Sequence, residues 1–108
     1  QELVFIRGGL RVRGSIVIGA PRVVDELEAR CDVEVRAPGL MEERASIAGS
    51  DPLQALILAT RFLGLRLQDF VAKGGKLTDL DGDELPLRAY FDYAPRPVIT
   101  IKVPRRRA

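Results

Sequence analysis

Acidic side chains are the main residues of this chain that could carry chemistry, because the sequence contains no histidine. Without histidine there is no Ser-His-Asp or Cys-His catalysis, no imidazole zinc ligand and no ordinary neutral-pH general base. Acid–base catalysis would then require paired carboxylates inside a pocket. Glu42-Glu43 and Asp25-Glu26-x-Glu28 fall in edge and loop contexts, where we expect them to be solvated. We assign no catalytic residue and no cofactor, and expect that the protein is not an enzyme.

The segment Asp79-x-Asp81-Gly82-Asp83 suggests calcium binding, because its alternating acids offer hard oxygen ligands. It lacks the glycine at position six and the glutamate at position twelve of an EF-hand loop. Asp and Gly also tolerate the backbone angles of tight turns. The pattern therefore predicts a turn, and we assign no metal site.

The single cysteine, Cys31, excludes an internal disulfide. It falls on an alternating strand pattern, which predicts a buried, unreactive thiol. A free thiol is compatible with a reducing cytoplasm, where we expect the protein to act. No stretch approaches the apolar length that spans a bilayer, and we expect no membrane association.

Basic residues are concentrated at the C-terminal end. The chain holds 17 Lys and Arg against 15 Asp and Glu. Residues 95–108 carry five of the basic residues and no acidic one, so residues 1–94 are mildly acidic. A body of this charge weakens the case for a basic nucleic-acid-binding face on the fold itself.

Hydrophobic alternation predicts four strands before a helix. Residues 3–7 and 10–18 flank Gly8-Gly9, a dipeptide suited to a tight hairpin turn. Residues 29–37 alternate strictly, residues 41–48 do so more weakly, and residues 21–28 are expected to form a loop or a brief helical turn.

A long helix follows, and its start is strongly marked. Asp51 can cap it, Pro52 suits the first helical position, and Gln54 stands where a capping box has Glu or Gln. The apolar pattern runs to about Val71 and ends at Gly74-Gly75.

These elements predict an α+β fold: an antiparallel four-stranded meander with one long helix packed on its apolar face, plus short C-terminal strands. Those strands are expected at residues 76–80, 84–90 and 98–103. Residues 1–94 would form a single domain, and 95–108 a basic strand and tail.

Helical periodicity predicts a core stripe of Leu53, Leu56, Ile57, Thr60, Leu63, Gly64, Leu67 and Val71, packed over Val12, Ile16, Cys31, Val33 and Val35.

Leu58, Phe62 and Leu65 form a second apolar ridge opposite that stripe, with Arg61 and Gln54 as its polar rim. An exposed apolar ridge usually has a cover. The cover could be the C-terminal segment, with its Phe91, Tyr93, Val98 and Ile101, or a second copy in a homodimer, or a different protein.

The block Gly49-x-Asp51-x-Leu53-Gln54-Ala55-Leu56-x-Leu58-Ala59, with Gly-Gly-Lys-Leu-Thr from Gly74, resembles an uncharacterised bacterial family of unknown function. The resemblance extends over about residues 1–87. It implies a small cytoplasmic bacterial domain and brings no established activity.

These observations favour a non-enzymatic protein-interaction domain of a bacterial cytoplasmic protein, similar in role to immunity or adaptor proteins. Its contact residues would be Leu58, Phe62, Leu65, Arg61 and Gln54. The alternative is a nucleic-acid-binding accessory that uses Arg105, Arg106 and Arg107 together with the aromatic residues of 90–93.

Overall fold

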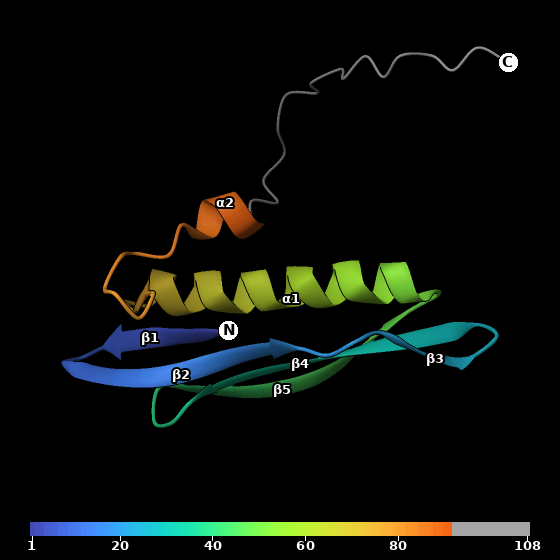
Figure 1. The fold of residues 1–108 in the computed structure, drawn as a ribbon, viewed down its shortest axis with the longest axis horizontal. Coiled ribbons are helices and arrows are strands. Elements are labelled where there is room, and N and C mark those ends of the chain that lie inside the picture. The colour runs from blue at the N-terminus through green and yellow to red at the C-terminus, as the bar shows by residue number, and fades with distance from the viewer. Residues whose placement is uncertain (92–108) are drawn as a thin grey trace, which may run out of the picture.

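A computed structural model describes residues 1–91 and shows one antiparallel sheet with a long helix lying across one of its faces (Figure 1). In chain order the elements are β1 (Glu2–Arg7), β2 (Leu10–Ile18), β3 (Arg22–Asp25), β4 (Glu28–Ala37), β5 (Met41–Gly49), α1 (Pro52–Ala72), β6 (Lys76–Thr78) and α2 (Leu87–Phe91). The α+β class predicted from the sequence is therefore confirmed.

Strand β4 is the centre of the sheet. Strand β5 pairs with it along its whole length, from Ala29↔Gly49 to Ala37↔Met41. The opposite edge of β4 is shared by β2 and β3, which lie one after the other. Strand β1 then pairs with β2, and β6 pairs with β1. The described residues thus form six strands: the four of the predicted meander, β6 within the C-terminal strand predicted at 76–80, and β3, which was not predicted.

The first hairpin is formed as predicted. Gly8 and Gly9 have φ angles of 57° and 81°, the left-handed conformation that a tight hairpin turn requires. Strand β3, by contrast, was predicted as a loop. All four of its residues are exposed, so they carry no alternation of buried and exposed positions, and the strand exists because β4 supplies backbone partners.

The core lies between α1 and one face of the sheet. Every second residue of β4 is buried there, as the strict alternation predicted, and Leu3, Phe5 and Leu77 extend this layer across β1 and β6. Phe5 meets Phe70 of α1 edge to face, with ring centroids 5.7 Å apart. Alternating strands and one helix thus complete a single core.

Helix α1 begins and ends where the sequence indicates. The Asp51 carboxylate accepts a hydrogen bond from the Gln54 backbone N–H at 2.8 Å, and Pro52 occupies the first turn. The Gln54 side-chain oxygen accepts from the Ser50 N–H at 2.6 Å, which resembles a capping box. After the helix the chain turns at Gly74 and enters β6.

The segment after β6 differs from its prediction. Residues 84–90 were expected to be extended, but after a single bridge between Thr78 and Glu84 the chain forms the short helix α2. In Figure 1, α2 lies on the side of α1 that faces away from the sheet, over the C-terminal half of α1. The strand predicted at residues 98–103 lies outside the described residues.

Candidate interaction surface

The face of α1 that packs on the sheet is not the one predicted. Leu63, Gly64 and Leu67 are buried as expected, but Leu53 and Ile57 are 66% and 55% exposed. Val71 is also exposed. Ala55, Ala59 and Phe70, which were outside the predicted stripe, are buried instead. The helix is therefore rotated about its own axis from the predicted orientation, by less than the angle of about 100° that separates successive residues.

Close approach of the helix to the sheet explains this rotation. A Cβ added at Gly49 in β5 would lie 2.5 Å from the backbone nitrogen of Ala55. Only small side chains fit between the sheet and the first turns of α1 at this separation. Ala55 and Ala59 take these positions, one turn apart, and the larger Leu53 and Ile57 are carried outward. The glycine before the helix and this pair of alanines were the sequence signals that would have indicated the correct face.

The outward side of α1 carries several exposed apolar side chains. Besides Leu53 and Ile57, Leu58 is 37% exposed and Leu65 is 50% exposed, as predicted for the ridge. We call Leu53, Ile57, Leu58 and Leu65 the α1 outer patch. Several exposed leucine and isoleucine side chains on the outer side of one helix are typical of a surface that contacts another polypeptide.

The other predicted contact residues differ in position. Phe62 is partly buried and contributes less surface than expected. Arg61 is exposed and lies between Ile57 and Leu65, so it stands within the patch and not at its rim as predicted. The Gln54 side chain is exposed, but its oxygen also accepts the hydrogen bond from Ser50 Oγ at 2.9 Å. Gln54 thus has a structural role at the helix start.

The C-terminal half of the same helix already has a cover. Leu85 and Leu87 are partly buried against the core, and α2 packs on α1. Helix α2 therefore covers part of α1 toward its C-terminal end, and Leu53, Ile57, Leu58 and Leu65 remain exposed.

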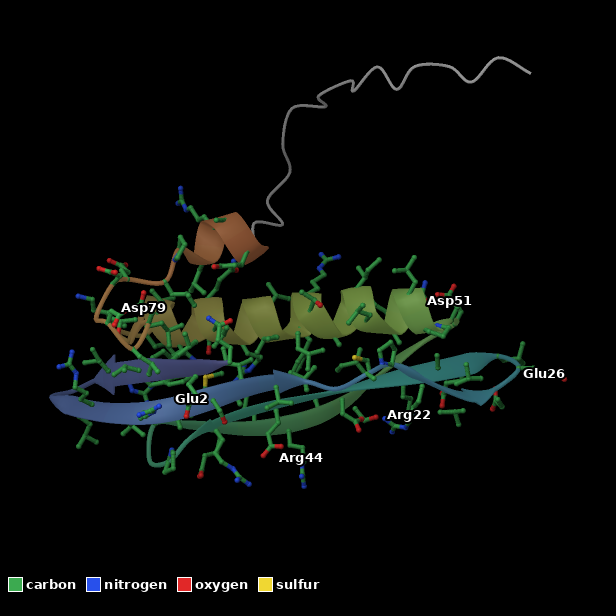
Figure 2. The ribbon with its side chains drawn as sticks, in the orientation of Figure 1. Glu2, Arg22, Glu26, Arg44, Asp51 and Asp79 are labelled. Atoms are coloured by element: carbon green, nitrogen blue, oxygen red, sulfur yellow. The ribbon has the colours of Figure 1, made fainter. Side chains whose placement is uncertain are left out.

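The opposite face of the sheet is polar and carries alternating charges. Figure 2 shows Arg22 and Arg44 on the side away from α1. Its ion pairs are Arg13–Glu2 at 2.7 Å, Arg22–Asp32 at 2.9 Å, Arg30–Glu28 at 3.0 Å, Arg36–Glu34 at 3.3 Å and Arg44–Glu34 at 3.8 Å. Each of these arginines faces a carboxylate. Such pairing reduces the net positive field that binding to phosphates requires.

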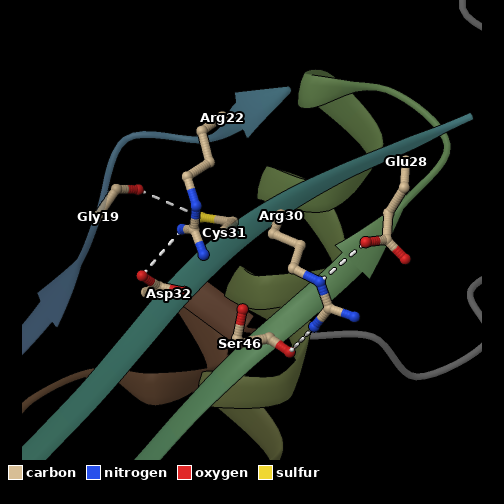
Figure 3. Close-up of polar contacts among 7 residues, drawn as sticks. All are labelled: Gly19, Arg22, Glu28, Arg30, Cys31, Asp32 and Ser46. Carbon is tan, nitrogen blue, oxygen red and sulfur yellow. Dashed lines mark hydrogen bonds and ion pairs between the residues drawn. The ribbon is translucent and has the colours of Figure 1, made fainter. Parts of the chain in front are cut away.

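Asp32 lies on that face and accepts a hydrogen bond from the Arg22 guanidinium at 2.9 Å (Figure 3). Hydrogen bonds from Ser46 and from Arg22 hold the pKa of Asp32 below its ordinary value, because both favour the charged form. A hollow of about 470 Å³ runs beside it, lined by Val17, Asp32, Glu34 and Arg44 among others. It is an open depression on the surface of the sheet.

Two other acids that could carry chemistry, Asp79 and Glu43, hold a turn and an ion pair. Asp79 Oδ1 accepts from the backbone N–H groups of Asp81 and Asp83, each at 2.9 Å, which confirms the predicted turn. Glu43 accepts from Arg66 Nε at 2.7 and 2.8 Å, through both carboxylate oxygens, and so links β5 to α1. Residues 1–91 contain no group of three or more acidic or cysteine side chains placed to hold a metal ion.

Cys31 is buried, as predicted. Its thiol donates a hydrogen bond to the carbonyl oxygen of Gly19, with sulfur and oxygen 3.2 Å apart (Figure 3). Burial raises the pKa of the Cys31 thiol, and the neighbouring Asp32 charge raises it further. Both effects reduce the fraction of reactive thiolate.

The chain matches no family model, no curated protein and no solved structure. Arg105, Arg106 and Arg107, the predicted nucleic-acid contacts, lie outside the described residues. Among the residues that the structure describes, neither helix is long and apolar enough to cross a membrane.

Proposed function

We propose that this protein is a non-enzymatic interaction domain that binds another polypeptide through the α1 outer patch. One observation carries the proposal: α1 exposes Leu53, Ile57, Leu58 and Leu65 away from the core, while α2 packs on α1 toward the C-terminal end of that helix (Figure 1). Full burial of such a side chain is worth about 1.5–3 kcal/mol. A partner that covers the patch would therefore gain a substantial apolar contribution.

Binding rather than catalysis is also favoured by how the reactive groups are used. Asp79 holds a turn, Glu43 pairs with Arg66, and Asp32 accepts from Ser46 and Arg22. These carboxylates are engaged in keeping the fold together. Burial and a raised pKa make the Cys31 thiol a poor nucleophile.

The partner would present an apolar surface of its own, such as an amphipathic helix or a small apolar groove. Arg61, which lies between Ile57 and Leu65 on the helix, would add a polar group within this apolar surface. The small size of the chain and its lack of a catalytic motif favour an adaptor-like or immunity-like role by analogy, and the sequence resemblance favours the bacterial cytoplasm.

The test compares two lysine variants of equal chemistry. Ile57→Lys changes the α1 outer patch, and Val17→Lys changes an apolar residue of similar exposure, 51%, on the opposite face. Lysine is a good helix former, so Ile57→Lys should fold normally. A partner captured from the source cells should be retained by Val17→Lys and weakened at least about tenfold by Ile57→Lys, the loss typical of a central contact.

Light scattering on the same samples covers self-association. If the partner is a second copy, the wild type and Val17→Lys should be dimers and Ile57→Lys a monomer. The proposal is wrong if Ile57→Lys, folded by circular dichroism, keeps both the captured partner and the mass of the wild type.

A further inference from the structure

Helix α2 begins a cover over α1 that stops partway along it. Leu85 and Leu87 pack against the core, and α2 then ends at Phe91. The apolar side chains of the α1 outer patch, nearer the start of the helix, remain exposed. Whatever follows Phe91 in the chain is therefore tethered beside the α1 outer patch.

The direction of α2 and the length of chain after it both favour this patch as a destination. In Figure 1, α2 runs opposite to α1, so its last residue points toward the N-terminal half of α1. From Leu65 to Leu53 the helix rises about 18 Å, at 1.5 Å per residue. An extended chain covers that distance in about six residues. The sequence continues for 17 residues beyond Phe91, which is more than enough.

The composition of that continuation matches the patch. Val98-Ile99-Thr100-Ile101-Lys102-Val103 places Ile99, Ile101 and Val103 on one side of an extended segment. The basic run 105–107 follows directly. A segment that ran along α1 toward its start would bring this run to the end of the molecule where Asp51 and Glu26 lie (Figure 2). Both its apolar and its charged residues would then meet complementary groups.

We propose that residues 98–103 dock on the α1 outer patch of the same chain as a strap that a partner must displace. The docking itself is an intramolecular contact. Its regulatory meaning rests on the proposed function, because the strap and the partner would compete for Leu53, Ile57, Leu58 and Leu65.

The docking test measures how fast a maleimide reagent modifies a single exposed cysteine in the full-length chain. Leu58→Cys reports on the patch, and Val17→Cys on the opposite face serves as the control, both with Cys31→Ala. Adding Ile99→Asp and Ile101→Asp should accelerate modification at position 58 about tenfold, as expected if about nine molecules in ten have the strap docked. The rate at position 17 should not change.

Equal rates at position 58 with and without the aspartates would overturn the docking. Protection that disappears on dilution would also overturn it, because a second copy would then be the cover. Affinity for the captured partner tests regulation separately. The variant with Ile99→Asp and Ile101→Asp should bind the partner more tightly than the wild type. Unchanged affinity would refute the strap as a regulator and leave the interaction function intact. If neither the wild type nor the aspartate variant binds a partner, but position 58 is still protected in the wild type, the proposed function fails and the docking stands.

Discussion

Two leucine truncations on α1 test the observed orientation of the helix directly. Leu67 is completely buried, whereas Leu53 is 66% exposed, although the periodicity of the sequence assigned both to the core. Leu67→Ala removes three buried carbons, worth about 0.8 kcal/mol each, and leaves a cavity whose cost adds to that sum. We expect a loss of about 3–4 kcal/mol in the free energy of unfolding. Leu53→Ala should cost less than about 1 kcal/mol, because most of its side chain already contacts water.

Urea unfolding followed by circular dichroism measures both values, and helix propensity cancels because the substitution is the same. The slope of free energy against urea should stay constant, so that a shift in the midpoint reports stability alone. The reasoning is refuted if the two variants lose equal stability. It is also refuted if Leu67→Ala costs less than about 1 kcal/mol.

Three further predictions concern single residues. Gly49→Ala should cost about 1–3 kcal/mol in urea unfolding, because the new methyl would lie 2.5 Å from the backbone nitrogen of Ala55, and a neutral result would contradict the close approach. Cys31 should react with a thiol reagent far more slowly in the native protein than in urea, since burial raises its pKa and lowers the thiolate fraction, so comparable rates would refute its burial. The folded-state pKa of Asp32 is lowered by Ser46 and Arg22, so its stabilising contribution is present above the unfolded pKa of about 4 and is lost as pH falls through the lower folded value. Asp32→Asn should therefore make the loss of stability on acidification shallower, and an unchanged pH slope would count against this assignment.

Local signals in the sequence were sufficient for most elements. Period-two alternation indicated β4 and its buried face, including Cys31, because alternate side chains of a strand point to opposite sides. Gly8-Gly9 indicated the first hairpin through the φ angles that the turn requires. Asp51 and Pro52 marked the first turn of α1, since capping depends only on neighbouring residues. Each of these features is decided within a few residues of chain.

Other features depended on distant partners, and only the tertiary structure decided them. Strand β3 pairs with β4 through backbone hydrogen bonds, and because all four of its residues are exposed it has no buried–exposed alternation that would have predicted it. The face that α1 buries depends on the close approach of Ala55 to Gly49 in the sheet. This packing outweighs the free energy that burial of Leu53 and Ile57 would have gained. The α1 outer patch is therefore a consequence of packing. Periodicity identified two apolar faces on the helix, but the shape of the sheet determined which residues face outward.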